Sequence, residues 1–194
     1  DPALLENDLL KSLYYLHAQP PLFNAFLGLV LKCSSQPAVS FDLFYKTAGT
    51  CMPLLFFGIL TSLAIRPAIA FIATVIYMLN PTLLLYENLL YYTHMEAFFI
   101  LLALFALLRW GIERRRGFLL LFFLSLLCLG MIRSLFHTVF FLLTALLFSL
   151  YLGYRHRERR LAGQFFLYSL VVLIPMVSLS VKNGLLYKSF GTSS

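Results

Sequence analysis

The fold is decided by residues 97–133, AFFILLALFALLRWGIERRRGFLLLFFLSLLCLGMIR. Two apolar runs without Asp, Glu, Lys or Arg, at 97–108 and 117–132, flank the basic cluster Glu113-Arg114-Arg115-Arg116. A hydrocarbon core about 30 Å thick takes roughly 20 apolar residues of helix. The stretch therefore predicts two membrane helices joined by a basic loop.

Segments of this kind recur along the 194 residues, of which 61% are hydrophobic and 12% charged, with a mean hydropathy of +0.87. This composition excludes an ordinary cytosolic domain. Backbone groups in lipid must be satisfied internally, and the Leu/Phe runs lack the alternation of a barrel. We therefore predict an all-α, polytopic transmembrane helix bundle with about seven apolar segments: 20–32, 41–65, 67–86, 95–111, 117–133, 135–154 and 162–182.

The two ends of the chain differ from this transmembrane domain at 20–182. Residues 1–19 carry leucines at near-helical spacing with acids between them, which predicts an amphipathic helix at the membrane interface. Pro20-Pro21 ends that helix, because proline cannot donate the helical hydrogen bond. Residues 183–194 are expected on the external side, and a start without Met indicates a fragment of a longer chain.

Orientation follows from two basic clusters, at 113–116 and 155–160, which the positive-inside rule places in the cytoplasm. Two spans fit between them, and the loop 86–96 then lies outside. If every earlier segment spans once, residues 1–19 fall on the cytoplasmic side, so one early segment must be partial or broken if they do not. The sequence leaves this parity open.

Several classes of function lack their signatures in this chain. Cys33, Cys51 and Cys128 show no spacing typical of disulfides or zinc sites and are interpreted as packing residues. The net charge of +7 lies beside hydrophobic spans and indicates topology rather than nucleic-acid binding. No Walker loop, GxSxG, HExxH or DxD motif is present.

Polar residues against a bilayer cost several kcal/mol unless they are paired or hydrated, so three groups of them are functional candidates. The first group is Asp1, Asp8, His17 and Gln19, in which an acid at the rim of a cavity could act as general base toward a hydroxyl or an amine. The alternative is a hydrated surface helix that ends at prolines.

The second group lies in 86–96 and comprises Glu87, His94 and Glu96. The alternative role for Glu96 is to favour the N-terminus of the next helix through its dipole. The third group is Arg133 and His137, expected four apart on one helical face, with Lys182. These cations suit a lipid-linked phosphate, and the alternative is pairing with lipid headgroups or with Glu96.

The segment Tyr14-Tyr15-Leu16-His17-Ala18-Gln19-Pro20-Pro21-Leu22-Phe23, followed by Asn80-Pro81 and a polar loop that ends in Glu96, resembles the GT-C membrane glycosyltransferases. This superfamily includes the protein O-mannosyltransferases and the lipid A aminoarabinose transferase, and the chain is most similar to their bacterial relatives. The resemblance implies a GT-C-like fold in the bacterial inner membrane with its active site outside. It also implies a polyprenyl-phosphate sugar donor, an unknown acceptor and an external helix at 1–19.

The resemblance further implies roles for these residues. Asp1 would deprotonate the acceptor, with Asp8 as a second candidate, and Glu96 matches a second acid of the family. Arg133 and Lys182 would stabilise the departing phosphate, while substrate binding falls to His17, Gln19, Glu87, His94 and His137. Some family members use a divalent metal, which we do not expect here because acids are sparse.

Two other classes of function stay open. A transporter or flippase component would carry charges at mid-membrane and inverted repeats. A non-catalytic membrane subunit would tolerate the loss of Asp1, Glu96 and Arg133 together. The transferase hypothesis instead expects these residues and Lys182 to meet at one outward-facing cavity.

Overall fold

The computed structural model describes residues 8–15, 20–133, 141, 143, 146–150, 154 and 159–188. All the regular structure in these residues is helical, as predicted. The helices are α2 (Leu9–Tyr15), α3 (Leu22–Cys33), α4 (Pro37–Ser62), α5 (Pro67–Met78), α6 (Pro81–Glu87), α7 (Tyr92–Glu113), α8 (Arg116–Ile132) and α10 (Arg159–Tyr187).

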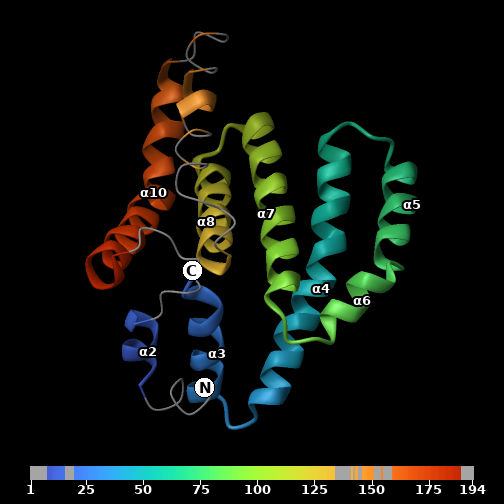
Figure 1. Ribbon diagram of the computed structural model, residues 1–194. Helices are drawn as coiled ribbons and strands as arrows, with labels where there is room; N and C mark the ends of the chain where they lie inside the picture. The colour runs from blue at the N-terminus through green and yellow to red at the C-terminus, as the bar shows by residue number, and fades with distance from the viewer. Residues whose placement is uncertain are drawn as a thin grey trace.

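The long helices form a row in the order α10, α8, α7, α4 and α5 (Figure 1). Each helix packs against its neighbour in this row, and α6 continues from α5 toward the start of α4. The short helices α2 and α3 lie at the lower ends of the long helices, where α3 contacts both α4 and α8. Helix α4 runs antiparallel to α5, and α7 runs antiparallel to α8, because a short turn connects the two helices of each pair.

Three described helices are long and apolar enough to cross a membrane: α4, α7 and residues Arg160–Tyr187 of α10. The pair α5 and α6 passes the same test together, so the described residues hold up to four spans. The prediction of a helical membrane bundle is thus confirmed, but its count of seven spans is not. Helix α3 has only 12 residues, α8 has 17, and segment 135–154 lies largely outside the described residues.

Prolines affect two of the spans differently. The predicted break at Asn80-Pro81 is confirmed, since α5 and α6 meet there at a bend of 58°. The Asn80 side chain accepts a hydrogen bond of 3.0 Å from the Thr82 amide, and Pro81 occupies the first turn of α6, where its missing N–H costs nothing. Pro53, in contrast, lies inside a continuous α4, so 41–65 is not a broken pair.

Apolar side chains cover the outer faces of these helices. On α5, Ile69, Phe71, Ile72 and Ile76 are each more than half exposed, and α10 exposes Leu167 and Ile174 to a similar extent. Contiguous apolar surface of this kind is rare on soluble monomers and marks contact with lipid or protein. A bilayer around the row would bury it, which agrees with the predicted membrane environment.

Charged residues divide between the upper and the lower ends of the long helices. The α4–α5 turn with Arg66, the α7–α8 turn with Arg114, Arg115 and Arg116, and the start of α10 lie together at the upper end in Figure 1. We call this the basic end. Helices α2 and α3, the starts of α4 and α7 and the ends of α6, α8 and α10 lie at the opposite end, which we call the polar end.

Close contact between α4 and α7 depends on Gly58. A Cβ atom at this position would lie 2.7 Å from Cε2 of Phe105 on α7, so we expect Gly58→Ala to destabilise the protein by about 1–3 kcal/mol. Thermal unfolding in detergent, followed by circular dichroism, measures this. The matched control is Gly163→Ala in α10, where nothing lies within 4 Å and alanine is the better helix former. Equal midpoints for Gly58→Ala and the wild type would contradict the packing described.

Candidate functional site

The polar end holds an ion pair between α7 and the end of α8. Helix α7 begins at Tyr92, which places Glu96 in its second turn with a side chain only 8% exposed. Arg133 follows the last residue of α8 and has an extended backbone, with φ −136 and ψ 134. One of its terminal nitrogens, Nη1, donates to both carboxylate oxygens of Glu96, at 3.3 and 3.2 Å.

The guanidinium of Arg133 also packs against an aromatic ring. Its central carbon lies 5.8 Å from the centre of the Tyr92 ring, and Phe23 of α3 packs edge-on against that ring at 6.0 Å. The Arg133 side chain nevertheless stays 43% exposed, and among the described residues it makes no further hydrogen bond. Arg133 is therefore a fixed cation with N–H donors left for an anion.

Two expectations about these residues need correction. Glu96 is not at the first turn of its helix, because α7 begins four residues earlier, so the capping interpretation is wrong. Arg133 and His137 were expected on one helical face, but α8 ends at Ile132. His137 itself lies outside the described residues. The alternative pairing of Arg133 with Glu96 is confirmed.

His94 joins α7 to α4. Its Nε2 lies 3.1 Å from the carbonyl oxygen of Tyr45, and the two rings stack with centres 5.3 Å apart. The Tyr45 hydroxyl donates to the carbonyl oxygen of Tyr91 at 2.8 Å. Both His94 and Tyr45 are 2% exposed. The His94 ring is thus used inside the protein, where it fixes the start of α7 beside α4.

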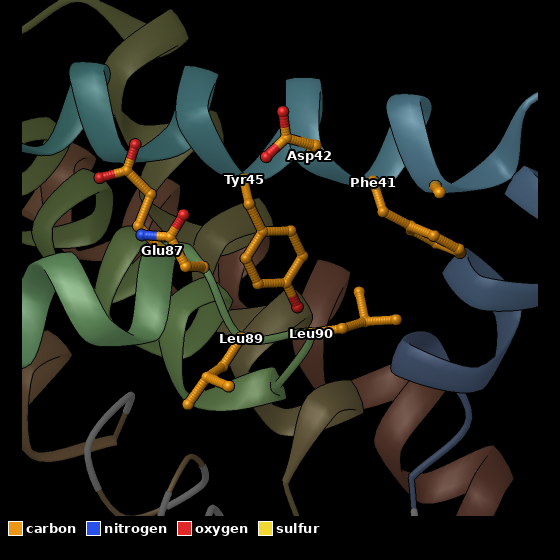
Figure 2. A pocket seen from close by; sticks show the side chains of 8 residues that line it. Phe41, Asp42, Tyr45, Glu87, Leu89 and Leu90 are labelled. Atoms are coloured by element: carbon orange, nitrogen blue, oxygen red, sulfur yellow. The ribbon is translucent and has the colours of Figure 1, made fainter.

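Beside this stack lies a cavity of about 290 Å³, which we call the α4 cavity. Figure 2 shows its lining, in which the first turns of α4 face the segment after α6. The lining residues are Ala38, Phe41, Asp42, Tyr45, Glu87, Asn88, Leu89 and Leu90. Two carboxylates therefore share this cavity, and Glu87 also lines a second one of about 230 Å³ with Gly49 and Pro53.

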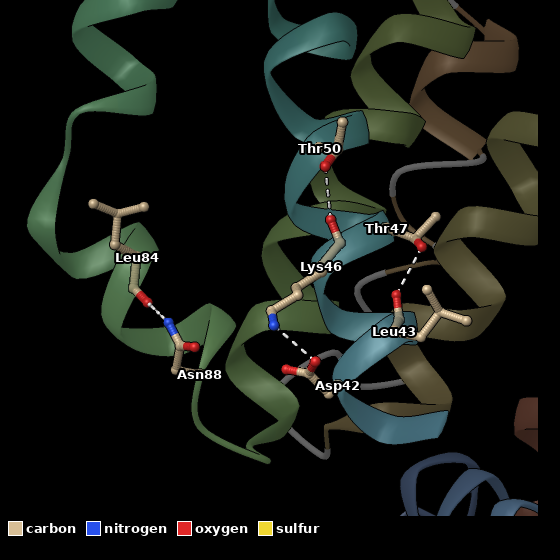
Figure 3. A network of polar contacts seen from close by, with 7 residues as sticks. All are labelled: Asp42, Leu43, Lys46, Thr47, Thr50, Leu84 and Asn88. Carbon is tan, nitrogen blue, oxygen red and sulfur yellow. Dashed lines mark hydrogen bonds and ion pairs between the residues drawn. The ribbon is translucent and has the colours of Figure 1, made fainter. Parts of the chain in front are cut away.

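The polar residues around the α4 cavity bond mainly to their own helices (Figure 3). Lys46 pairs with Asp42 at 2.7 Å, one helical turn apart. The Asn88 side-chain nitrogen donates to the carbonyl oxygen of Leu84 at 2.8 Å. Thr47 and Thr50 likewise donate to carbonyl oxygens of the preceding turn. These bonds are local, so they hold the rim in shape.

Lys182 ties the end of α10 to α2. Its Nζ donates to the carbonyl oxygen of Tyr14 at 3.0 Å and lies 6.0 Å from the Tyr14 ring. The Tyr187 hydroxyl donates to the carbonyl oxygen of Tyr15 at 2.6 Å. The last carbonyls of a helix have no partners within it, so these two side chains cap α2. Lys182 shares the polar end with Arg133, but its described contacts are with α2.

Several of the predicted site residues lie at the polar end. Glu96 and Arg133 meet directly, and Glu87, His94 and Lys182 lie at the same end of the row, where Asp8 is exposed just before α2. Asp1, His17 and Gln19 lie outside the described residues, so their predicted roles stay predictions. Asp42 and Tyr45 were not singled out from the sequence. An acid and a lysine four apart in an apolar segment was the one signal for Asp42.

The described part of the chain contains no group of three or more His, Cys, Asp or Glu side chains arranged to hold a metal ion. Cys33, Cys51 and Cys128 are free thiols. No family model, curated protein or solved structure matches the chain. A proposal for function therefore depends on the geometry of the polar end.

Proposed function

We propose that the chain belongs to a glycosyltransferase of the bacterial inner membrane, which moves a sugar from a polyprenyl-phosphate donor to an acceptor at the outer face. The observation that carries this proposal is the fixed, half-exposed guanidinium of Arg133 at the polar end. By the positive-inside rule the basic end faces the cytoplasm, so the polar end faces outward. The sequence resemblance to GT-C enzymes supports the same reaction.

The reaction that fits is a single displacement. An oxygen or nitrogen of the acceptor forms the new bond to the anomeric carbon, the bond from that carbon to the phosphate oxygen breaks, and the acceptor proton passes to a base. Negative charge then develops on the leaving phosphate. A fixed guanidinium stabilises this charge with two N–H donors, so no acid has to protonate the leaving group.

Within this proposal Glu96 is a positioning residue. Its carboxylate is buried and occupied by Arg133, so it orients the guanidinium rather than accepting the acceptor's proton. The base remains the role predicted for Asp1, with Asp8 as the second candidate. Asp8 is exposed at the polar end, as a group that meets an external acceptor must be.

One observation favours a second candidate, a transporter or flippase component. The α5–α6 span is broken with a bend of 58°, and discontinuous helices form substrate sites in many transporters. The two functions differ in their products. Movement of labelled lipid across reconstituted vesicles without a new glycosidic bond would favour transport, whereas release of polyprenyl phosphate with transfer of the sugar would favour the transferase.

Recognition of the leaving group can be tested without knowing the acceptor. We expect the full chain in nanodiscs to bind polyprenyl phosphate about tenfold or more tightly than the uncharged polyprenol, because charge-assisted hydrogen bonds to Arg133 are added. Quenching of a fluorescent polyprenyl group measures both affinities. Equal affinities would contradict a phosphate site, and a preference unchanged in Arg133→Met would contradict its placement at Arg133.

A further inference from the structure

We propose that the α4 cavity binds a primary ammonium group, carried by a lipid headgroup such as ethanolamine or by a small free amine. This inference goes beyond glycosyl transfer and does not depend on it, because it concerns different residues and a binding event alone. It is argued from the hydrogen-bonding state of the lining, from its aromatic rings and from its size.

The charge of the cavity comes chiefly from Glu87. Its carboxylate lies against Gly49 of α4, where a Cβ atom would be 2.8 Å from the carboxyl carbon, so this position depends on the glycine. Among the described residues Glu87 makes no hydrogen bond or ion pair, although its side chain is half-buried. A partly desolvated charge without a partner is costly, and a cation in the cavity would offset that cost.

Most side-chain donors on the lining are already used. The Tyr45 hydroxyl donates to Tyr91, and the Asn88 amide nitrogen donates to Leu84. Apart from the second N–H of the Asn88 amide, the groups left over are acceptors: both oxygens of Glu87, the amide oxygen of Asn88 and one oxygen of Asp42, whose other oxygen binds Lys46. A ligand must therefore bring donors and positive charge. A primary ammonium supplies three N–H donors, whereas a quaternary one supplies none.

The rings and the volume narrow the ligand further. Phe41 and Tyr45 present aromatic surface to the cavity (Figure 2), and a cation near such rings gains about 0.5–2 kcal/mol. A volume of about 290 Å³ lies at the lower limit of small-molecule pockets, which fits a headgroup rather than a large substrate. Leu89 and Leu90 offer apolar contacts for the carbon chain that carries the amine.

The test uses the full chain in nanodiscs with equal amounts of phosphatidylethanolamine and phosphatidylcholine, followed by native mass spectrometry of the retained lipid, with no sugar donor present. We expect the wild type to retain the ethanolamine lipid about tenfold better, and Glu87→Gln to bring the ratio close to one. The matched control is Glu113→Gln at the basic end, where the acid pairs with Arg115 at 3.2 Å. Its ratio should equal that of the wild type.

A second variant separates charge from position. Gly49→Ala keeps the carboxylate but displaces it from the cavity, and it should also reduce the preference. Competition by soluble ethanolamine identifies the source: displacement supports a site for a free amine, and retention of the lipid supports a site for the headgroup. Equal retention of both lipids by the wild type, or a preference that survives in Glu87→Gln, would overturn the proposal. Neither outcome bears on binding of polyprenyl phosphate.

Discussion

Arg133→Ala is expected to lower the rate of sugar transfer by about 10²–10³-fold, the usual effect of removing one group that stabilises transition-state charge. The guanidinium is fixed by Glu96 and by the Tyr92 ring, so it needs little reorganisation as charge develops on the leaving phosphate. The measurement is the release of labelled polyprenyl phosphate from a polyprenyl-phosphate sugar by the full-length protein in proteoliposomes.

Loss of activity in this variant could also come from misfolding. Glu96 is buried, and removal of its partner leaves an uncompensated charge at a cost of about 3–5 kcal/mol. The double variant Arg133→Met with Glu96→Gln removes both charges and should fold, yet stay inactive. Arg133→Lys keeps the charge without the planar fork and should lie between the wild type and alanine. Wild-type rates in the folded double variant would contradict the proposed mechanism.

The chain's helices could be predicted from hydropathy because lipid imposes a simple rule: backbone groups must be satisfied within each segment. The break at Asn80-Pro81 was equally local in origin, since proline chemistry alone determines it. The number of spans was harder to predict. An apolar run of 13 residues at 20–32 looks like part of a span, but whether it crosses depends on packing of α3 against its neighbours, among them α8, which is distant in sequence.

The candidate site was predicted mainly as separate polar residues, and the pairing of Arg133 with Glu96 was predicted only as an alternative. Glu96 and Arg133 are 37 positions apart, and His94 is 49 positions from Tyr45, so no local pattern pairs them. An error of four residues in the start of α7 was enough to turn the partner of Arg133 into a supposed helix cap. The α4 cavity was missed because its acceptor-rich character depends on which groups the Tyr45 and Asn88 side chains donate to. The Tyr45 hydroxyl donates to a residue distant in sequence, and the Asn88 amide donates to the preceding helical turn only because α6 forms there.

The orientation of the bundle yields the second large effect, an all-or-none difference in labelling. Asn88 and Arg114 are both exposed, but Asn88 lies at the polar end and Arg114 at the basic end. In the full chain with Cys33, Cys51 and Cys128 replaced by serine, we expect Asn88→Cys to react with a membrane-impermeant maleimide on intact cells. Arg114→Cys should react only after permeabilisation, because the positive-inside rule predicts that the basic end faces the cytoplasm.

The test requires that the bilayer, and not a low intrinsic reactivity of the new cysteine, protects Arg114→Cys in intact cells. The chain offers a matched control for this reactivity. Arg66→Cys lies at the same basic end in a different turn and should behave like Arg114→Cys. The opposite pattern, with both basic-end cysteines labelled from outside, would place Arg133 and the α4 cavity in the cytoplasm. A lipid-linked sugar at the outer face could not then reach the guanidinium, so this result would exclude external transfer while leaving the Glu96–Arg133 pair itself intact.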